Sequence, residues 1–209
     1  NQIRTNHVTN NNIISAMTVL PRERFVPESL TEIAYVDTAI QVANGRHIVA
    51  PMVLARLIQE ANVSSDDLVQ VIGCGTGYAA AILSNMSKAV VLVEDQPEVC
   101  DKAEALFIEL GIDNVLVFKT DLVNGCKKQA PFNIIIICGA IEEVPIKLIN
   151  QLEEGGRIIT MILDSELVSY PTTKATILTK YNGKLVGKEV FEVNTPKIKS
   201  FNKDKVFKF

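Results

Sequence analysis

The sequence predicts a doubly wound α/β fold with a mostly parallel sheet and an antiparallel hairpin near its C-terminal end. Short apolar runs alternate with amphipathic helical segments between residues 67 and 163. A glycine-rich turn, residues 73–77, joins the first run to the helix that follows it, and Asn182-Gly183 separates two later strand-like runs. Alternating strands and helices build parallel sheets, and Asn-Gly between two strands is the strongest short signal for a hairpin.

Length and composition limit the class of protein. With 209 residues, 47% of them hydrophobic, we expect a single domain over residues 1–209, in which residues 1–50 form a helical or irregular N-terminal extension. A net charge of -3 argues against a nucleic-acid binder. No apolar run reaches the roughly 18 residues of a membrane span, and the four cysteines lack metal-site spacing. A cytoplasmic protein without a metal or a membrane partner is expected, and its oligomeric state is open.

Hydrophobic periodicity gives the order of the predicted elements. An irregular segment at 20–27 and a loop at 44–51 precede a helix from Met52 to Ala61, whose apolar residues share one face. Five short apolar runs then have the character of central parallel strands covered on both faces, at residues 67–72, 89–93, 115–118, 134–138 and 157–163.

Helices are expected between these strands. The first covers 78–86, the second runs from Pro97 to a capping Gly111, and the third covers 146–152 and is closed by Gly155-Gly156. Proline suits the first helical turn and glycine the position after the last one. The runs 176–181 and 184–190 form the predicted hairpin, and the lysine-rich residues 197–209 are interpreted as a solvated tail.

The turn Gly73-Cys74-Gly75-Thr76-Gly77 lies at the carboxyl end of a strand, where open α/β sheets bind ligands. Glycines let the backbone turn sharply and approach a ligand closely. Dinucleotide folds use Gly-x-Gly-x-x-Gly, whereas here Gly77 comes one residue early and Tyr78 takes the expected place. The spacing favours S-adenosylmethionine over a dinucleotide, and a βα turn without a ligand is the alternative.

Acidic residues end the next two predicted strands. Glu94, followed by Asp95, lies roughly twenty residues after the turn, where a carboxylate accepts hydrogen bonds from ribose hydroxyls. Asp121 ends the third strand in the same way and is a candidate for the adenine edge. Polar strand ends without a ligand are the alternative, but the turn and Glu94 together favour a ligand that carries ribose.

With these residues in place, the sequence resembles the protein-L-isoaspartate O-methyltransferase family from about Leu20 to Val190. The similar blocks occur in the family's order, at residues 21–27, 34–37, 44–51, 73–78, 131–133, 143–145 and 152–157. The resemblance implies a Rossmann-like class I methyltransferase fold, with S-adenosylmethionine as methyl donor and S-adenosylhomocysteine as product. The implied acceptor is the carboxylate of an isoaspartyl residue in a damaged protein or peptide, whose methylation begins repair.

The resemblance also implies which residues hold the cofactor: Glu94 with Asp95 at the ribose, Asp121 with Leu122 near adenine, and a cradle of Gly73, Cys74, Gly75, Gly77 and Tyr78. Three positions depart from the family pattern. Val49 stands where the family has a serine assigned to the substrate carboxylate, and valine forms no side-chain hydrogen bond. Val71 and Asn133 stand where the family usually carries acidic residues.

Neighbouring charged residues are the remaining candidates for the acceptor side. Arg46 and His47 precede Val49, and arginine can bind a carboxylate through two N–H groups, although loop residues without a ligand are an equal alternative. Glu142 and Glu143 would repel an anionic acceptor and are expected to cap the helix that begins near Pro145.

Three functions remain open at this point. The first is a repair methyltransferase that acts on isoaspartyl residues. The second is a related methyltransferase with a different acceptor, which the substitutions Val49, Val71 and Asn133 favour. The third is a catalytically weak protein that binds S-adenosylmethionine.

Overall fold

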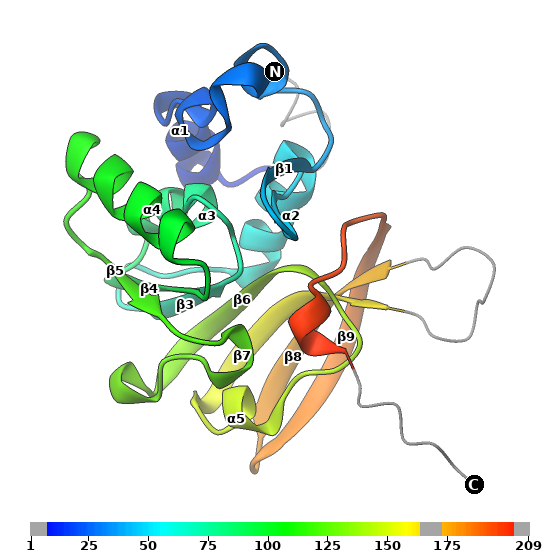
Figure 1. Ribbon diagram of the computed structural model, residues 1–209. Coiled ribbons are helices and arrows are strands. Elements are labelled where there is room, and N and C mark those ends of the chain that lie inside the picture. The colour runs from blue at the N-terminus through cyan, green and yellow to red at the C-terminus, as the bar shows by residue number, and fades with distance from the viewer. Residues whose placement is uncertain (1–7, 164–172, 203–209) are drawn as a thin grey trace, which may run out of the picture.

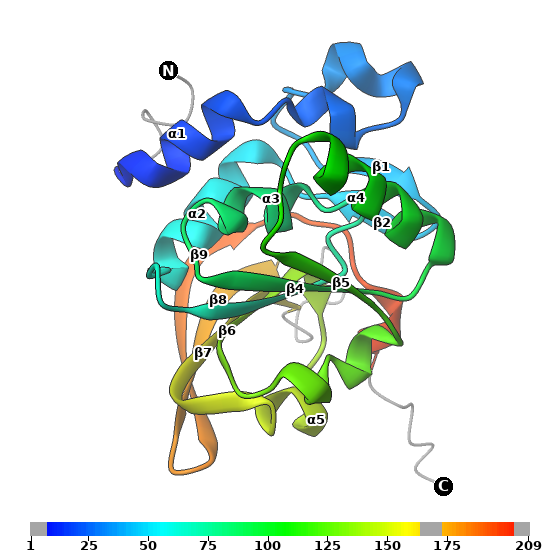
Figure 2. The ribbon, with the colours of Figure 1, turned by 90° about the vertical axis from the view of Figure 1, so that its left-hand side faces the viewer.

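The computed structural model describes residues 8–163 and 173–202. A seven-stranded sheet contains β3 (Leu68–Ile72), β4 (Ala89–Glu94), β5 (Val115–Lys119), β6 (Phe132–Ile141), β7 (Leu152–Leu163), β8 (Thr173–Tyr181) and β9 (Lys184–Val193). Helices α2 (Pro51–Ala61), α3 (Tyr78–Ser84) and α4 (Pro97–Glu109) cover one face, and the short α5 (Ile146–Ile149) lies on the other (Figures 1 and 2). The predicted α/β class is confirmed.

The strand order is β5-β4-β3-β6-β7-β8-β9. The pairs from β5 to β7 are parallel, and β8 and β9 are antiparallel, so the mostly parallel sheet with a terminal hairpin is confirmed. The chain leaves β3 toward β4 on one side and returns to β6 on the other. This reversal of strand order opens a crevice at the carboxyl ends of β3 and β6, where such sheets bind ligands.

Side chains of the central strands alternate between two cores. In β6, Ile134 and Ile136 belong to the core beneath α2, α3 and α4, whereas Ile135 and Ile137 belong to the core beneath α5. All four side chains are fully buried. Each contributes about 1.5–3 kcal/mol of hydrophobic stabilisation, so the strand that ends at the crevice is held firmly on both faces.

Local signals account for the ends of several elements. Pro97 begins α4, and Gly111 follows its last turn with a positive φ of 66°, as predicted. The hairpin turn between β8 and β9 places Asn182 at φ 50° and Gly183 at φ 74°. Two consecutive residues with positive φ characterise the turns that match the twist of a hairpin, which explains why the sequence signal held.

Two predicted segments are wrong. The predicted loop at 44–51 contains the strand β2 (Arg46–Ile48), which pairs with β1 (Ile40–Ala43) across a turn at Asn44-Gly45 and forms a second small sheet. The helix at 146–152 is only the four residues of α5, and Gly155 lies within β7. Tertiary pairing decides this difference, since Leu152 is already the register partner of Phe132 in β6.

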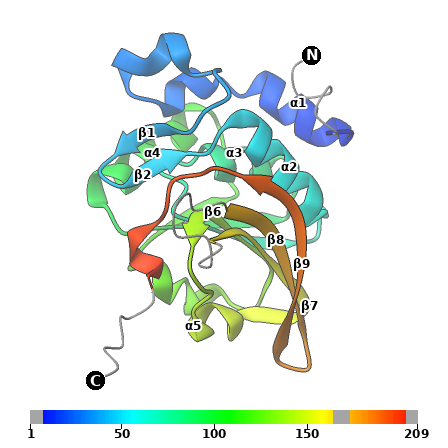
Figure 3. The ribbon, with the colours of Figure 1, turned by 90° about the vertical axis from the view of Figure 1, so that its right-hand side faces the viewer.

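The chain after β9 turns back across the sheet. Residues 194–201, here called the crossing segment, include the single turn η6 (Lys199–Phe201). In Figure 3 this segment, coloured red, passes below the β1–β2 hairpin toward the opposite side of the molecule. It pairs with the end of β6, where the Ala140 amide donates to Pro196 O at 3.0 Å and the Ile198 amide donates to Ala140 O at 2.9 Å. The crossing segment therefore reaches the crevice at the strand ends.

Candidate active site

The glycine turn lies at the carboxyl end of β3, beside β6, where the strand order reverses. Gly73, Gly75 and Gly77 have φ values of 66°, 64° and 94°. These left-handed conformations are strained for residues with a side chain, and they curl the backbone between β3 and α3. The Gly73 amide donates to Val93 O at 3.1 Å, which ties the turn to the end of β4. The backbone thus has the shape expected of a ligand-binding turn.

Glu94 ends β4 next to this turn and is fully buried. Its Oε1 accepts a hydrogen bond from Nε of Arg46 at 2.7 Å and another from the Asp95 amide at 2.9 Å. Nη2 of Arg46 contacts Oδ1 of Asp95 at 2.5 Å, so one guanidinium spans both carboxylates. Among the described residues, Oε2 of Glu94 has no hydrogen-bond partner.

Burial shifts the pKa of two side chains at this site. Burial raises the pKa of the Glu94 carboxyl, and the Arg46 charge opposes that shift. Burial also lowers the pKa of His47, and the positive charge of Arg46 lowers it further. His47 is therefore neutral near pH 7 and attracts an anion weakly. Arg46 and His47 were candidates for binding an anionic acceptor, with loop residues without a ligand as an equal alternative. The guanidinium of Arg46 is engaged by two carboxylates of the chain.

Side chains of the protein itself fill the space above the glycines. A Cβ placed on Gly73 would lie 3.1 Å from Cδ1 of both Ile198 and Leu122, and a Cβ on Gly75 would lie 2.6 Å from Cγ2 of Val42. On the β6 side, a Cβ on Gly139 would lie 2.5 Å from Cγ1 of Ile198. Side chains of Ile198, Leu122 and Val42 therefore lie against the glycines of the predicted cofactor site.

Tyr78 was predicted to line the cofactor, and the structure directs its ring toward the N-terminal segment instead. The Tyr78 ring packs edge-on against Phe25 with centroids 5.2 Å apart, and the Arg22 guanidinium lies 4.9 Å from its centroid. Arg22 is fully buried and donates to the carbonyls of Ala34 at 2.7 Å and Val49 at 2.9 Å. The Tyr78 ring thus contacts the arginine that binds the backbone carbonyl of Val49.

Val49 is buried immediately before α2, where the family pattern places a serine. Its side chain offers no hydrogen bond there. The first turn of α2 is held from outside the helix, since the Met52 amide donates to Oδ1 of Asp37 at 3.1 Å. A cavity of about 550 Å³ adjoins this turn; Asp37, Thr38, Ala50 and Thr195 are among its lining residues.

The remaining predicted cofactor residues divide between surface and core. The Asp121 carboxylate is exposed and accepts from Nδ2 of Asn124 at 3.2 Å, whereas Leu122 is buried against Gly73. Cys74, which the family resemblance places in the cofactor cradle, is buried. The Cys138 thiol lies within hydrogen-bonding reach of Cys74, and this contact together with burial raises the pKa of Cys138 well above its usual value.

Two side chains expected near the site serve elsewhere. Glu142 was expected to cap α5 and forms an ion pair with Lys197 of the crossing segment, whereas the N-cap residue of α5 is Pro145; a capping role of Glu143 stays a prediction. Asn133 lies at the opposite end of β6, where its Oδ1 accepts from the Leu68 amide at 2.8 Å. Lys197 is therefore anchored rather than part of a solvated tail, and residues 203–209 lie outside the described residues.

Ile198 is the residue of this site that the sequence reasoning missed. It is an apolar side chain between Lys197 and Lys199, and that isolated apolar position in a basic stretch was the available signal. Its 4% exposure reflects its place over the glycine turn. The distance along the chain between Ile198 and Gly73 hides the contact from any local pattern.

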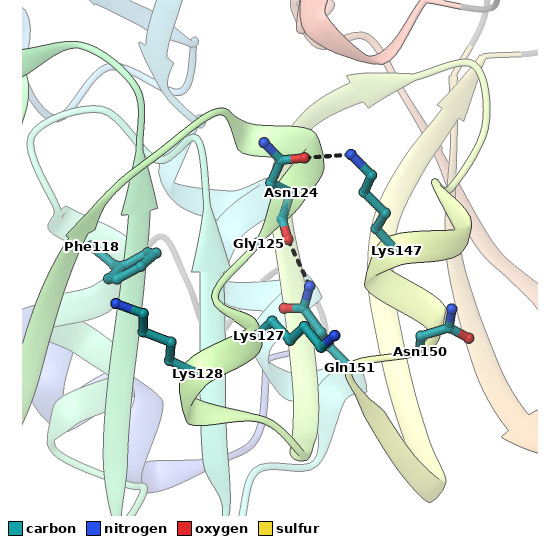
Figure 4. Close-up of a pocket in the computed structure, with 8 residues that line it drawn as sticks. All are labelled: Phe118, Asn124, Gly125, Lys127, Lys128, Lys147, Asn150 and Gln151. Carbon is teal, nitrogen blue, oxygen red and sulfur yellow. Dashed lines mark hydrogen bonds between the residues drawn. The ribbon is translucent and has the colours of Figure 1, made fainter.

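A second cavity of about 480 Å³ lies between α5 and the turns η4 (Leu122–Asn124) and η5 (Lys127–Gln129). Figure 4 shows the Nζ of Lys147 donating to Oδ1 of Asn124, at 2.7 Å, beside the buried Gln151. Glu94 and the glycines of the turn at residues 73–77 are not among the residues that line this cavity. Within the described part of the chain, no cluster of side chains could hold a metal ion and no helix is long and apolar enough to cross a membrane.

Comparison with known proteins agrees with this geometry. Residues 1–194 match the family model of protein-L-isoaspartate(D-aspartate) O-methyltransferase. A protein-L-isoaspartate O-methyltransferase of Gloeobacter violaceus is 33% identical over 192 residues, which cover 92% of each chain.

Solved structures are similar as well. One, a protein-L-isoaspartate O-methyltransferase, has a TM-score of 0.80 at 27% identity over 94% of this chain, which spans 63% of the length of that chain. Another, a putative protein-L-isoaspartate O-methyltransferase of Plasmodium falciparum in complex with S-adenosyl-L-homocysteine, has a TM-score of 0.79 at 20% identity, covers 95% of both chains and is similar in fold. The chain belongs to the protein-L-isoaspartate(D-aspartate) O-methyltransferase family, whose members are S-adenosylmethionine-dependent methyltransferases.

Proposed function

We propose that the protein transfers the methyl group of S-adenosylmethionine to the carboxylate of isoaspartyl residues in damaged proteins or peptides. Family membership supports this activity. The structural observation that carries the proposal is the carboxylate of Glu94, which is buried beside the glycine turn with Oε2 unpartnered among the described residues. A buried acceptor without a donor costs about 1–3 kcal/mol, and a ribose hydroxyl would supply the missing donor.

In this proposal the chain positions the cofactor more than it activates it. Glu94 accepts hydrogen bonds from the ribose, the backbone of Gly73 and Gly75 approaches the cofactor closely, and Leu122 packs beside the adenine with Asp121 at its edge. Bound S-adenosylmethionine supplies a methyl group on a positively charged sulfur; the acceptor oxygen forms the ester bond as the carbon–sulfur bond breaks. The acceptor carboxylate is already ionised near pH 7, so the chain needs no general base, and alignment with exclusion of water is its main contribution.

The acceptor is proposed to enter through the cavity beside the first turn of α2. That cavity adjoins Ala50, the neighbour of Val49, and Thr38 and Thr195 offer hydroxyl groups at its wall. Neutral His47 is half-buried in the adjoining strand. Because Val49 lacks the hydroxyl of the family serine, alignment of the acceptor depends on these groups and on the backbone.

A second candidate function is a protein that binds the cofactor but methylates isoaspartyl residues weakly, or that methylates a different acceptor. The observations that favour it are Val49 at the position of the serine and the occupation of Glu94 Oε1 by Arg46. Both reduce what the site offers to the expected substrates, although neither removes the cofactor residues.

One assay separates these functions. The purified protein is incubated with radiolabelled S-adenosylmethionine and a peptide that contains an isoaspartyl residue, beside the same peptide with a normal aspartyl residue. Label on the isoaspartyl peptide alone is the expected result. Equal background labelling of both peptides, with S-adenosylhomocysteine still bound in calorimetry, would favour the second candidate.

We place the activity in the cytoplasm, since all four cysteines are free thiols.

A further inference from the structure

We propose that Ile198 and Arg46 occupy the methyl-donor site themselves, so that the cofactor binds only when the crossing segment and the Arg46 side chain move aside. This inference rests on the proposed function, because it concerns the same donor site. Ile198 and Arg46 would lower the affinity for the cofactor by competing with it for the same space. Without cofactor, these two side chains close the donor site.

The first line of support is the position of Ile198. Its side chain lies against both Gly73, which directly follows β3, and Gly139 of β6, and these two strands border the crevice. Glycine at these positions permits close approach of a ligand, and here the nearest approach is made by the chain's own isoleucine. The main chain keeps it there through two hydrogen bonds to Ala140, and Lys197 adds an ion pair to Glu142.

The second line of support is the position of Arg46. Its guanidinium donates to Glu94 Oε1 and Asp95 Oδ1, the groups expected to meet the ribose. Arg46 is itself buried, with 5% of its surface exposed. A cavity of about 260 Å³ lies directly beyond it, lined by Asn44 and Gly45 on the hairpin and by Lys199 and Ser200 on the crossing segment. In the open state proposed here, the guanidinium would swing outward into this cavity.

The two groups are mechanically linked. The cavity beyond Arg46 is bounded by the crossing segment, so withdrawal of that segment also widens the path for Arg46. The crossing segment carries Pro196, which lines the proposed acceptor cavity, and Pro196 O would lie 3.2 Å from a Cβ on Gly139. Its displacement would therefore connect the donor turn with the acceptor cavity. Because the cofactor binds only to the open state, its apparent dissociation constant equals the intrinsic constant divided by the fraction of molecules that are open.

The test measures S-adenosylhomocysteine binding to the full-length protein by calorimetry. Ile198→Ala shortens the side chain over the glycines, and Arg46→Met removes the ion pair while keeping a side chain of similar length. Ile13→Ala, which trims a fully buried isoleucine of α1 (Asn11–Val19), and Arg24→Met, which removes an exposed ion pair with Glu109, are the matched controls. Ile198→Ala removes a buried apolar contact from the closed state, and Arg46→Met removes a paired charge from it. Because each change destabilises the closed state, each should tighten binding of S-adenosylhomocysteine about tenfold.

Three outcomes are distinguishable. Tighter binding by Ile198→Ala and Arg46→Met, with both controls equal to the wild type, supports the proposal. Equal affinity in all five proteins overturns it and leaves the proposed function intact. No binding by any protein at millimolar ligand, including the double variant Ile198→Ala/Arg46→Met, overturns both.

Amide hydrogen exchange provides an independent readout that does not depend on variants. In the wild-type protein, the Ile198 amide is hydrogen-bonded to Ala140 O and should exchange slowly. Saturating S-adenosylhomocysteine should accelerate exchange in residues 195–201 while it slows exchange in the glycine turn. Unchanged protection of Ile198 with the ligand bound would show that the crossing segment stays in place, and the proposal would fail.

Discussion

The guanidinium of Arg46 holds the carboxylate of Glu94 at 2.7 Å, and both side chains are buried at the carboxyl end of β4. Taking two charges out of water is costly unless they are well paired. The pair therefore makes the closed arrangement stable while it leaves Oε2 of Glu94 without a partner among the described residues. Glu94 is the expected ribose ligand, and it also holds Arg46, the side chain that we propose excludes the ribose.

Replacing Glu94 by glutamine should weaken cofactor binding by about 1–3 kcal/mol, because a charged acceptor for the ribose hydroxyls is lost. Calorimetry with S-adenosylhomocysteine measures the effect, in the wild-type background and in Arg46→Met, where the competing ion pair is absent. Glu98→Gln on the exposed first turn of α4 is the control. An unchanged affinity in the Arg46→Met background would mean that Glu94 does not hold the ribose.

Introducing a hydroxyl at Val49 should increase methyl transfer to an isoaspartyl peptide by about tenfold, the effect of one added hydrogen bond to the acceptor. Val49→Ala also shortens the side chain but adds no hydroxyl, and it serves as the control. Initial rates with labelled cofactor compare the three proteins. If Val49→Ser and Val49→Ala behave alike, bulk rather than hydrogen bonding governs the acceptor side.

Arg22→Met should lower the free energy of unfolding by about 2–4 kcal/mol. The fully buried guanidinium donates to the carbonyls of Ala34 and Val49, and its loss leaves both acceptors without that donor. Urea unfolding followed by circular dichroism gives the difference. Arg24→Met, which breaks an ion pair between two exposed side chains, should change stability by less than about 1 kcal/mol. Equal losses in the two variants would contradict the structural role of Arg22.

Tyr78 should make the protein sensitive to alkaline pH. Burial raises the pKa of its phenol from 10.0 to about 12. The folded chain keeps the proton over a range in which the unfolded chain has lost it, so the stabilisation is present below pH 10 and falls as the pH rises toward 12. The loss amounts to roughly 2–3 kcal/mol.

Ultraviolet titration should show one of the four tyrosines ionising at about pH 12, and Tyr78→Phe should abolish that late step. Unfolding measured between pH 9 and pH 12 should lose most of its slope in the same variant. A slope that persists in Tyr78→Phe would assign the alkaline sensitivity to other groups.

Local patterns were sufficient for much of the fold. The run Ile134 to Cys138 is apolar on both faces, and the structure places it in the centre of the parallel sheet as β6. Asn182-Gly183 adopts the two positive φ values that a tight hairpin requires. Such features depend on residues within one element or one turn, so the sequence can carry them without knowledge of the rest of the chain.

The same holds for the kind of ligand. The glycine spacing from Gly73 to Gly77, followed by Glu94 at the next strand end, was enough to predict S-adenosylmethionine, the cofactor of the family to which the chain belongs. Each signal lies next to a strand end, and parallel strands bring their carboxyl ends to one edge of the sheet.

Only the tertiary structure decided what these groups touch. Arg46 meets Glu94 because the β1–β2 hairpin folds over the end of β4, and Ile198 meets Gly73 because the chain crosses back after β9. Tyr78 lies beside the glycine turn in sequence, yet its ring turns toward Arg22. Contacts between distant segments depend on how whole elements pack against one another. The sequence by itself therefore determined a strand, a turn with three glycines and a helix, with an acidic residue at the end of the next strand, and the packing decided that Ile198 lies against Gly73 and that Arg46 pairs with Glu94.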